Sequence, residues 1–380
     1  MINILHIINS FDKGGAEMML LKFLKETDKK KFINIVICLK STGFMTDIFE
    51  KYDIKSYHIK MNTFFDLFSS LKLIFQIIKI HNPVVIMSWL HISDLISFFI
   101  KIKFPKIKII WNLRCSAPKI SILGVKSWVL VKILGFVSKI PDCIIANSQY
   151  GLDSHIKIGY KPNIKRVLHN GFDTNKFKYN LNKNLLFRKK YNIRINDFVI
   201  GFIGKKAKIK GLDLFVNSIN IINKKYKNLK FVFVGKELDN SNISLYNELK
   251  KKDCLKNSIM LGEKNNLEGI ITSFDLLVIT SRSEGFPNVL GEAMSIKVPC
   301  VSTDVGDCKY IIGNEGIIVK SFDTIEISNA IEKFYKMPLK NKLKMGVKAR
   351  KRIKSEFNIE KIVSVYENLI MSVTNGSIQK

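Results

Sequence analysis

Short apolar runs alternate with longer segments of helical period along most of the chain. In the first half the runs predict strands at residues 2–8, 33–39, 84–87, 107–112, 143–146 and 165–168. The segments between them predict helices at 65–80, 92–101, 123–138 and 148–157, and a further helix that starts at Gly14. Strands and helices in alternation form a parallel sheet that is covered on both faces.

The alternation stops between Asp173 and Asp197, where Lys and Asn replace the apolar period, as in a linker. It resumes with strands expected at 198–203, 230–234, 258–261, 274–279 and 300–303, and a last helix is expected at about 358–373. A length of 380 residues suits two domains with separate cores. We therefore expect an α/β fold with two Rossmann-like domains, residues 1–180 and 190–355.

Composition narrows the class of protein. The six cysteines are scattered without metal-ligand spacing, and most fall in or beside apolar runs, so we expect reduced thiols in a cytoplasmic protein. The start of the chain lacks the pattern of a signal peptide, and no apolar run reaches the ~18 residues that span a bilayer.

The formal net charge of +30 widens the choice of partners. Nucleic acid, an anionic membrane surface and phosphorylated substrates all suit a basic chain. Lysine greatly outnumbers arginine and the excess is spread over both halves, so compositional drift on solvated faces is an equal explanation.

The richest chemistry lies in residues 280–299, which follow an apolar run that reads as a buried strand. Pro287 suits the first position of a helix, with Glu284 just before that helix and Glu292 within it. Free backbone amides are expected at this helix start, where a parallel sheet binds its ligands. They belong to Gly285, Phe286, Asn288 and Val289.

The two glutamates could suggest a glycosidase, but such carboxylates flank the scissile bond from opposite sides, roughly 5–9.5 Å apart. Glu284 and Glu292 lie on one segment, so we interpret them as acceptors for ligand hydroxyls. A capping glutamate and a solvated helix glutamate would give the same spacing.

A second group follows the strand at 198–203, in the glycine turn from Gly204 to Gly211. Lys205 and Lys210 with the exposed amides could clamp a diphosphate. The order of a P-loop is absent, and a solvated lysine loop is the simpler alternative.

Candidates in the first half also follow expected strand ends. Gly14 and Gly15 allow a phosphate close to the start of a helix. His91 and Arg114 lie on the expected ligand side of the sheet. Each of these residues taken alone is more often structural.

Two apolar helices, expected within 63–80 and 119–139, carry regularly spaced lysines. The second has an aromatic residue, Trp128, and a one-sided basic stripe made of Lys119, Lys126, Lys132 and Lys139. An interfacial membrane helix has this pattern, and so does a buried crossover helix with one wet edge.

Taken together, these motifs resemble the retaining glycosyltransferases of family 4, which have the GT-B fold. The resemblance rests on residues 14–17, on Asn170-Gly171-Phe172-Asp173, on the turn from Gly204 to Gly211, and on residues 284–292, which match the E-x₇-E signature with its Gly-Phe-Pro core. It implies two domains that face each other across a cleft, and a C-terminal helix (residues 356–380) that returns to the first domain.

The resemblance also implies roles. Glu292 would bind the ribose of a nucleotide sugar, Glu284 with the Gly285 and Phe286 amides would hold the donor sugar, and Lys205 and Lys210 would neutralise the diphosphate without a metal. Gly204 would contact the donor, and Gly15 would contact the donor phosphates or the acceptor from the other domain. Many relatives carry a histidine at the place where this chain has Arg114. The guanidinium of Arg114 cannot act as a base, so Arg114 would bind the donor or an anionic acceptor.

The resulting hypothesis is a retaining, hexosyltransferase-type enzyme of bacterial surface polysaccharide (lipopolysaccharide) biosynthesis that needs no cofactor. It would move a sugar from a nucleotide-diphosphate sugar, UDP above others, to a glycan or lipid-linked acceptor, on the inner face of the membrane. A sugar-nucleotide epimerase would lack the E-x₇-E motif. A nucleic-acid-binding protein would need aromatic residues among the basic loops, and the turn from Gly204 to Gly211 has none.

Overall fold

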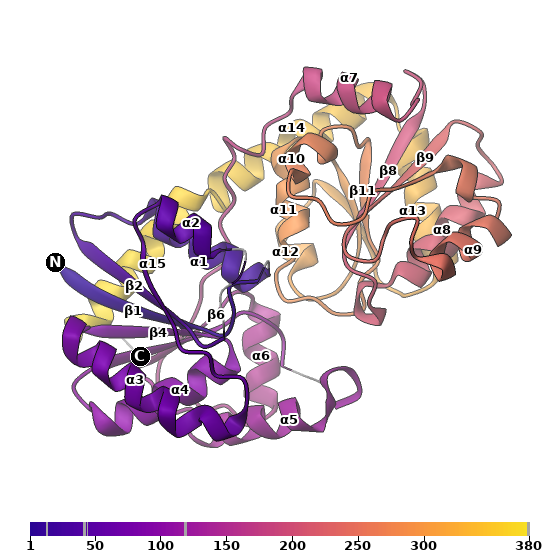
Figure 1. The fold of residues 1–380 in the computed structure, drawn as a ribbon. Helices are drawn as coiled ribbons and strands as arrows, with labels where there is room; N and C mark the ends of the chain where they lie inside the picture. The colour runs from indigo at the N-terminus through magenta and orange to yellow at the C-terminus, as the bar shows by residue number, and fades with distance from the viewer. Residues whose placement is uncertain (13, 41–42, 44, 118–119, 378–380) are drawn as a thin grey trace. The chain divides into compact units, whose positions relative to one another are not determined.

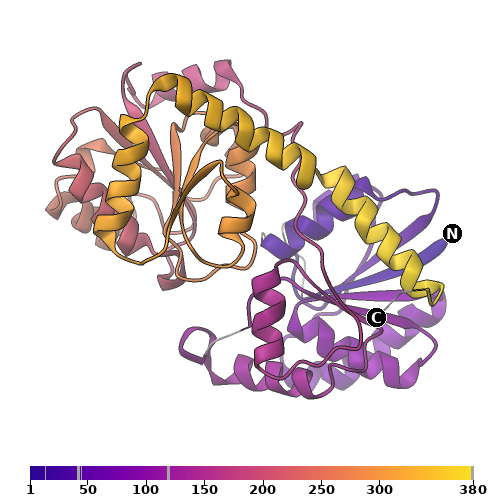
Figure 2. The ribbon, with the colours of Figure 1, turned by 180° about the vertical axis from the view of Figure 1, so that it is seen from behind.

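The computed structural model describes residues 1–12, 14–40, 43, 45–117 and 120–377. The chain divides into two compact units, Met1–Gly171 with Ile359–Lys380, and Phe172–Asn358. Each unit is a parallel sheet between helices, as the alternation of elements predicts (Figures 1 and 2).

Unit 1 holds a seven-stranded parallel sheet in the order β3-β2-β1-β4-β5-β6-β7. Its strands are Ile2–Ile8 (β1), Phe32–Cys38 (β2), Lys55–His58 (β3), Val85–Trp89 (β4), Lys108–Leu113 (β5), Cys143–Ala146 (β6) and Lys165–Val167 (β7). Its helices are Gly15–Glu26 (α1), Thr46–Lys51 (α2), Leu67–His81 (α3), His91–Lys103 (α4), Ile120–Phe136 (α5), Gln149–Lys157 (α6) and Ile359–Thr374 (α15), with a 3₁₀ turn at Phe64–Asp66 (η1).

Both faces of the first sheet are buried, because successive side chains of a strand point to opposite sides. In β1, Ile4 and Ile8 join a core with α1 and α15, whereas Leu5 and Ile7 join a second core with α3, α4 and α5. The C-terminal helix α15 therefore completes unit 1, and Figure 2 shows it lying along that unit.

Unit 2 holds a six-stranded parallel sheet in the order β10-β9-β8-β11-β12-β13. Its strands are Phe198–Ile203 (β8), Leu229–Val234 (β9), Ser258–Met260 (β10), Leu276–Ile279 (β11), Cys300–Thr303 (β12) and Gly316–Val319 (β13). Its helices are Leu181–Lys190 (α7), Leu212–Asn223 (α8), Ile243–Lys251 (α9), Leu267–Ile271 (α10), Asn288–Ser295 (α11), Cys308–Ile312 (α12), Thr324–Lys336 (α13) and Leu339–Glu356 (α14), with 3₁₀ turns at Lys208–Lys210 (η2) and Leu255–Asn257 (η3).

Three local predictions were wrong. The expected linker contains helix α7, which has no apolar period because Phe187 alone of its residues is buried. Pro287 is not inside α11 but caps it in an extended conformation, and Asn288 is the first helical residue. The helix expected at 123–138 begins earlier, at Ile120, and leaves helical geometry at Gly124, which has φ 78°.

The other expectations on composition concern thiols and membrane spans. All six cysteines are free, and five of them are buried. Within the described residues, no helix combines the length and apolar character that crossing a bilayer requires.

Candidate active site

The predicted residues of unit 2 gather at the carboxyl ends of β8 and β11, which are neighbours in the sheet. Lys210 Nζ lies 2.6 Å from Glu284 Oε1 and forms an ion pair with it. Ser281 Oγ donates to the same carboxylate oxygen at 2.6 Å. The Glu284 side chain is 11% exposed and that of Lys210 is 28% exposed, so the pair is shielded yet open to a ligand.

The two loops that carry this pair are fastened to each other. Gly211 has φ 64°, and a Cβ there would overlap Thr280 O, so this position requires glycine. Thr280 Oγ1 donates to Gly211 O at 2.7 Å, and Arg282 N donates to Ile209 O at 2.8 Å. Lys210 and Glu284 are thus held together by the main chain on both sides.

The loop after β12 supports the Glu284 segment from another side. Gly306 has φ 55°, and a Cβ there would lie 2.6 Å from Gly285 O. Asp307 N donates to Gly285 O at 2.9 Å. Gly306 and Asp307 therefore pack directly on the Glu284–Gly285 backbone.

Phe286 anchors the same segment in the core. Its side chain is 5% exposed and stacks on Phe172, with ring centroids 6.1 Å apart. Position 291 of α11 requires glycine, because a Cβ there would overlap the Phe172 ring. The side chain of Phe286 fixes the loop, which leaves its amide as the group that could meet a ligand.

The remaining predicted residues of unit 2 surround the pair at different depths. Lys205 lies in the same turn as Lys210 and is exposed. Asn288 and Val289 open α11, and Glu292 follows on that helix, half-buried. Gly204 directly follows β8, and its N–H donates to Val234 O at 2.9 Å.

In unit 1, Gly14 and Gly15 lie at the start of α1, as predicted. Glu17 folds back over this start, because a Cβ on Gly14 would overlap its carboxylate. The Glu17 side chain accepts from Ser10 Oγ at 3.4 Å, and burial raises the pKa of its carboxyl. The space that we expected a phosphate to approach is therefore lined by a carboxylate.

Arg114 is enclosed within unit 1. Its guanidinium donates to Tyr366 Oη at 3.0 Å and, by a short contact, to Asn170 Oδ1. It also lies over the Trp89 ring, 5.5 Å from the centroid. Residues from β4, α15 and the loop after β7 thus surround this cation, and 8% of the residue is exposed.

His91 is the first residue of α4, and its Nε2 lies 2.9 Å from His155 Nε2 of α6. Sequence reasoning missed His155 and Ser281. Ser281 lies three residues before Glu284, a spacing that could have suggested a local contact, whereas no pattern around His155 relates it to His91.

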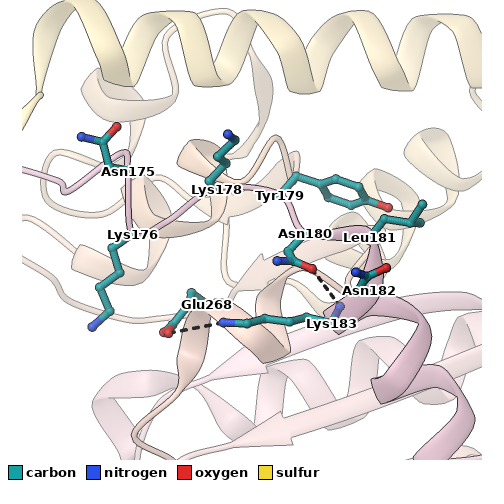
Figure 3. Close-up of a pocket in the computed structure, with 9 residues that line it drawn as sticks. All are labelled: Asn175, Lys176, Lys178, Tyr179, Asn180, Leu181, Asn182, Lys183 and Glu268. Atoms are coloured by element: carbon teal, nitrogen blue, oxygen red, sulfur yellow. Dashed lines mark hydrogen bonds and ion pairs between the residues drawn. The ribbon is translucent and has the colours of Figure 1, made fainter.

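A hollow of about 510 Å³ lies elsewhere on unit 2, and Figure 3 shows its lining by Asn175, Lys176, residues 178–183 and Glu268. Lys183 Nζ reaches Glu268 Oε1 at 3.9 Å across it. None of the predicted site residues lines this hollow. Among the residues that the structure describes, no group of three or more His, Cys, Asp or Glu is placed to hold a metal ion.

Two units, each built on a parallel sheet between helices, are typical of the GT-B class. Residues 197–337 match the family model for group 1 glycosyl transferases. The crystal structure of Anabaena Alr3699/HepE in complex with UDP and glucose superposes with a TM-score of 0.86 at 17% identity, over 98% of this chain and all of that one. The chain is thus similar to the group 1 glycosyltransferases, and it has the GT-B fold.

Two curated relatives match about half of the chain. The capsular polysaccharide biosynthesis glycosyltransferase CapM of Staphylococcus aureus is 28% identical over 208 residues, 53% of this chain and 52% of CapM. The UDP-Gal:alpha-D-GlcNAc-diphosphoundecaprenol alpha-1,3-galactosyltransferase of Escherichia coli is 27% identical over 211 residues, 54% of each chain. The chain thus spans about half the length of these relatives.

Proposed function

We propose that the protein transfers a hexosyl group, with retention of anomeric configuration and without a metal, from a UDP-sugar to a hydroxyl of a glycan or lipid-linked oligosaccharide. The observation that carries this proposal is the Lys210–Glu284 ion pair of 2.6 Å, held between two strand ends of unit 2. UDP in the superposed HepE structure and the diphosphoundecaprenol acceptor named for the E. coli relative support the donor and acceptor classes.

Loss of the diphosphate is the costly charge separation in such a reaction, and fixed cations at the leaving group lower its barrier. Lys210 and Lys205 would supply these cations. Glu284, held by Ser281 Oγ, would accept hydroxyls of the donor sugar and stabilise positive charge at its anomeric carbon. Glu292 would accept the ribose hydroxyls. The amides of Gly285, Phe286, Asn288 and Val289 would complete the donor site with Gly204, and Gly15 would contact the donor from unit 1.

We also propose that the protein acts at an anionic membrane surface on the cytoplasmic side, through helices α3 and α5 of unit 1. Exposed apolar side chains follow one face of α5 at helical spacing, Val125 (62%), Val129 (42%), Ile133 (52%) and Phe136 (91%). Phe68 and Ile80 of α3 are 83% and 68% exposed. An apolar face beside lysines suits a helix in the headgroup layer.

The charge on α5 fits that proposal. Lys126 and Lys132 are exposed, and Lys132 Nζ lies 5.4 Å from the centre of the Trp128 ring. Lys139 is exposed just beyond the helix, whereas Lys119 lies outside the described residues. Each lysine near an anionic surface contributes about 1 kcal/mol to binding.

The donor proposal is tested by ligand-observed NMR of the purified protein with UDP-, GDP- and ADP-sugars. Wild type should bind UDP-sugars, and Glu292→Ala should abolish that binding. Glu326→Ala, which removes an exposed carboxylate of α13 in the same unit, serves as the control. Equal binding by wild type and the Glu292 variant would exclude the proposed role of Glu292.

A further inference from the structure

Leu90 joins β4 to α4 in a backbone conformation that residues with side chains rarely adopt. Its φ of 73° and ψ of 163° lie in a region that is almost restricted to glycine. The surrounding structure enforces this turn, in which Leu90 N donates to Asn112 O at 3.3 Å. Such strain concentrates at functional sites. Here it sets His91 as the first residue of α4, at the strand end where a parallel sheet binds ligands.

The hydrogen bonds of His155 determine where its proton lies. Nδ1 of His155 is 2.8 Å from Gly151 O, and a carbonyl oxygen can only accept, so Nδ1 carries a hydrogen. A neutral imidazole has one N–H, so Nε2 of His155 is then bare and acts as an acceptor. Burial keeps the ring neutral by lowering the pKa of His155 to about 4.

The tautomer of His155 determines which ring nitrogen of His91 carries the hydrogen. Nε2 of His91 is 2.9 Å from the bare Nε2 of His155 and must therefore donate. Burial and the neighbouring His155 lower the pKa of His91 to about 3, so this ring is neutral as well. His91 Nδ1 is then a bare nitrogen, which has no hydrogen-bond partner within the described part of the chain. The residue itself stays partly exposed.

The groups around the pair do not supply a negative charge near pH 7. Tyr160 packs on His155 with ring centroids 5.0 Å apart. Burial raises the pKa of the nearby Asp94 of α4 to about 8 and that of Cys115 to about 12. An imidazolium at either position would therefore lack a counter-ion.

We propose that His91 Nδ1 accepts a hydrogen bond from a substrate hydroxyl, and that His155 is a positioning residue that fixes His91 in the Nε2–H tautomer. A bare ring nitrogen selects an O–H donor and rejects a phosphate oxygen, which offers no hydrogen at neutral pH. The proposal rests on the proposed function in one respect, since it takes the hydroxyl to be that of the donor sugar or of the acceptor glycan.

The first test reads the tautomers directly and needs no substrate. Full-length protein labelled with ¹⁵N-histidine is examined at pH 7 by long-range ¹H–¹⁵N correlation, and the six histidines are assigned from variants. We expect a bare Nδ1 in His91 and a bare Nε2 in His155, unchanged down to about pH 5. The Nδ1–H tautomer of His91, or an imidazolium at either site at pH 7, overturns the proposal.

The second test identifies the hydroxyl. UDP-glucose, UDP and methyl α-glucoside are added in turn while the His91 Nδ1 signal is followed. A shift with UDP-glucose and not with UDP assigns the hydroxyl to the donor sugar, and a shift with methyl α-glucoside assigns it to the acceptor. An unmoved signal while UDP-glucose binds and the glucoside saturates removes the ligand role. If no nucleotide sugar binds, the proposed transferase function fails, while the tautomer test still decides the histidine pair.

Variants separate positioning from simple support of the fold. His155→Gln keeps an acceptor towards His91 and should preserve its tautomer and the transfer rate. His155→Phe removes the acceptor, so His91 should lose its fixed Nε2–H tautomer and kcat/KM should fall about fivefold to tenfold, as for loss of one neutral hydrogen bond. An unchanged His91 tautomer in folded His155→Phe protein would show that His155 positions nothing, and the wild-type spectrum remains decisive if that variant does not fold.

Discussion

Arg114 Nη1 donates to the Tyr366 hydroxyl at 3.0 Å, a contact between residues 252 positions apart. It joins the loop after β5 to α15, so that a cation expected to meet a ligand instead holds the C-terminal helix within unit 1. Both residues are buried, and Tyr366 has no exposed surface. A buried charged donor that loses a hydrogen-bond partner lowers the stability of the folded protein. The contribution of this contact to stability can therefore be measured.

Tyr366→Phe removes the acceptor and leaves the rest of the ring in place. We expect the free energy of unfolding to fall by about 1–3 kcal/mol, because a buried guanidinium N–H is left without its partner. Chemical denaturation monitored by circular dichroism measures the change. Tyr246→Phe is the control, since Tyr246 is exposed on α9, and it should change stability by less than about 0.5 kcal/mol.

Lys210→Met and Glu284→Gln should each lower kcat about 10²–10³-fold, the usual effect of removing one preorganised charge or donor at a developing charge. The double variant should lose less than the product of the two effects, because the side chains form one ion pair. Initial rates of sugar transfer measure all three. Lys206→Met is the control, because Lys206 lies in the same turn and its Nζ donates to Asn242 Oδ1. An equal loss of kcat in this variant would argue against a specific role for Lys210.

Asp94 predicts a pH dependence of stability. Burial raises the pKa of this carboxyl from its usual value near 3.8 to about 8 in the folded protein, so between these pH values the folded state binds the extra proton. Stability contributed by this proton is full below pH 3.8 and is lost as the pH rises to 8. Asp94→Asn mimics the protonated acid, so its stability relative to wild type should increase from pH 5 to pH 8, by at most about 1.4 kcal/mol per pH unit.

Asp66 predicts the opposite pH dependence of stability to Asp94, and the same denaturation series can measure it. Backbone hydrogen bonds from Thr63 and Asn62 lower the pKa of the partly exposed Asp66, so the stability that its carboxylate contributes is present at neutral pH and is lost in acid. Asp66→Asn should therefore differ most from wild type at pH 7 and least at low pH. Parallel pH profiles for the Asp94 and Asp66 variants would contradict the assignment.

Membrane binding should depend on α5. Lys126→Glu combined with Lys132→Glu reverses two exposed charges beside the apolar face, and flotation with anionic liposomes should fall by at least about tenfold. The pair Lys250→Glu and Lys251→Glu makes the same change of charge on α9 of unit 2 and should leave flotation unchanged. Equal loss in both double variants would indicate attraction by net charge and not by α5.

The period of apolar residues was enough to predict the central strands of both parallel sheets, because strands buried on both faces have a strong signal. It missed the edge strands β3 and β13, which are less buried. It was not enough for α7, whose one buried residue, Phe187, leaves no period. Lys210 and Glu284 could be brought together in advance because each follows a strand end, and parallel strands end at one edge. His91 and His155 could not, since their contact depends on how α4 and α6 pack. The cleft between the domains stays a prediction.

Both ends of unit 2 lie side by side, because Phe172 N donates to Phe357 O at 2.8 Å and Phe172 pairs with Asn358. The flanking residues of unit 1 meet in the same way, with Gly171 against Ile359. In the order of the chain, unit 2 is therefore a domain inserted into unit 1. A domain whose two ends lie close together can be removed or replaced without breaking the fold of the host domain. The residues that we propose to recognise the donor could then be exchanged between relatives as one contiguous gene segment, residues 172–358, without interrupting the sequence that builds the other sheet.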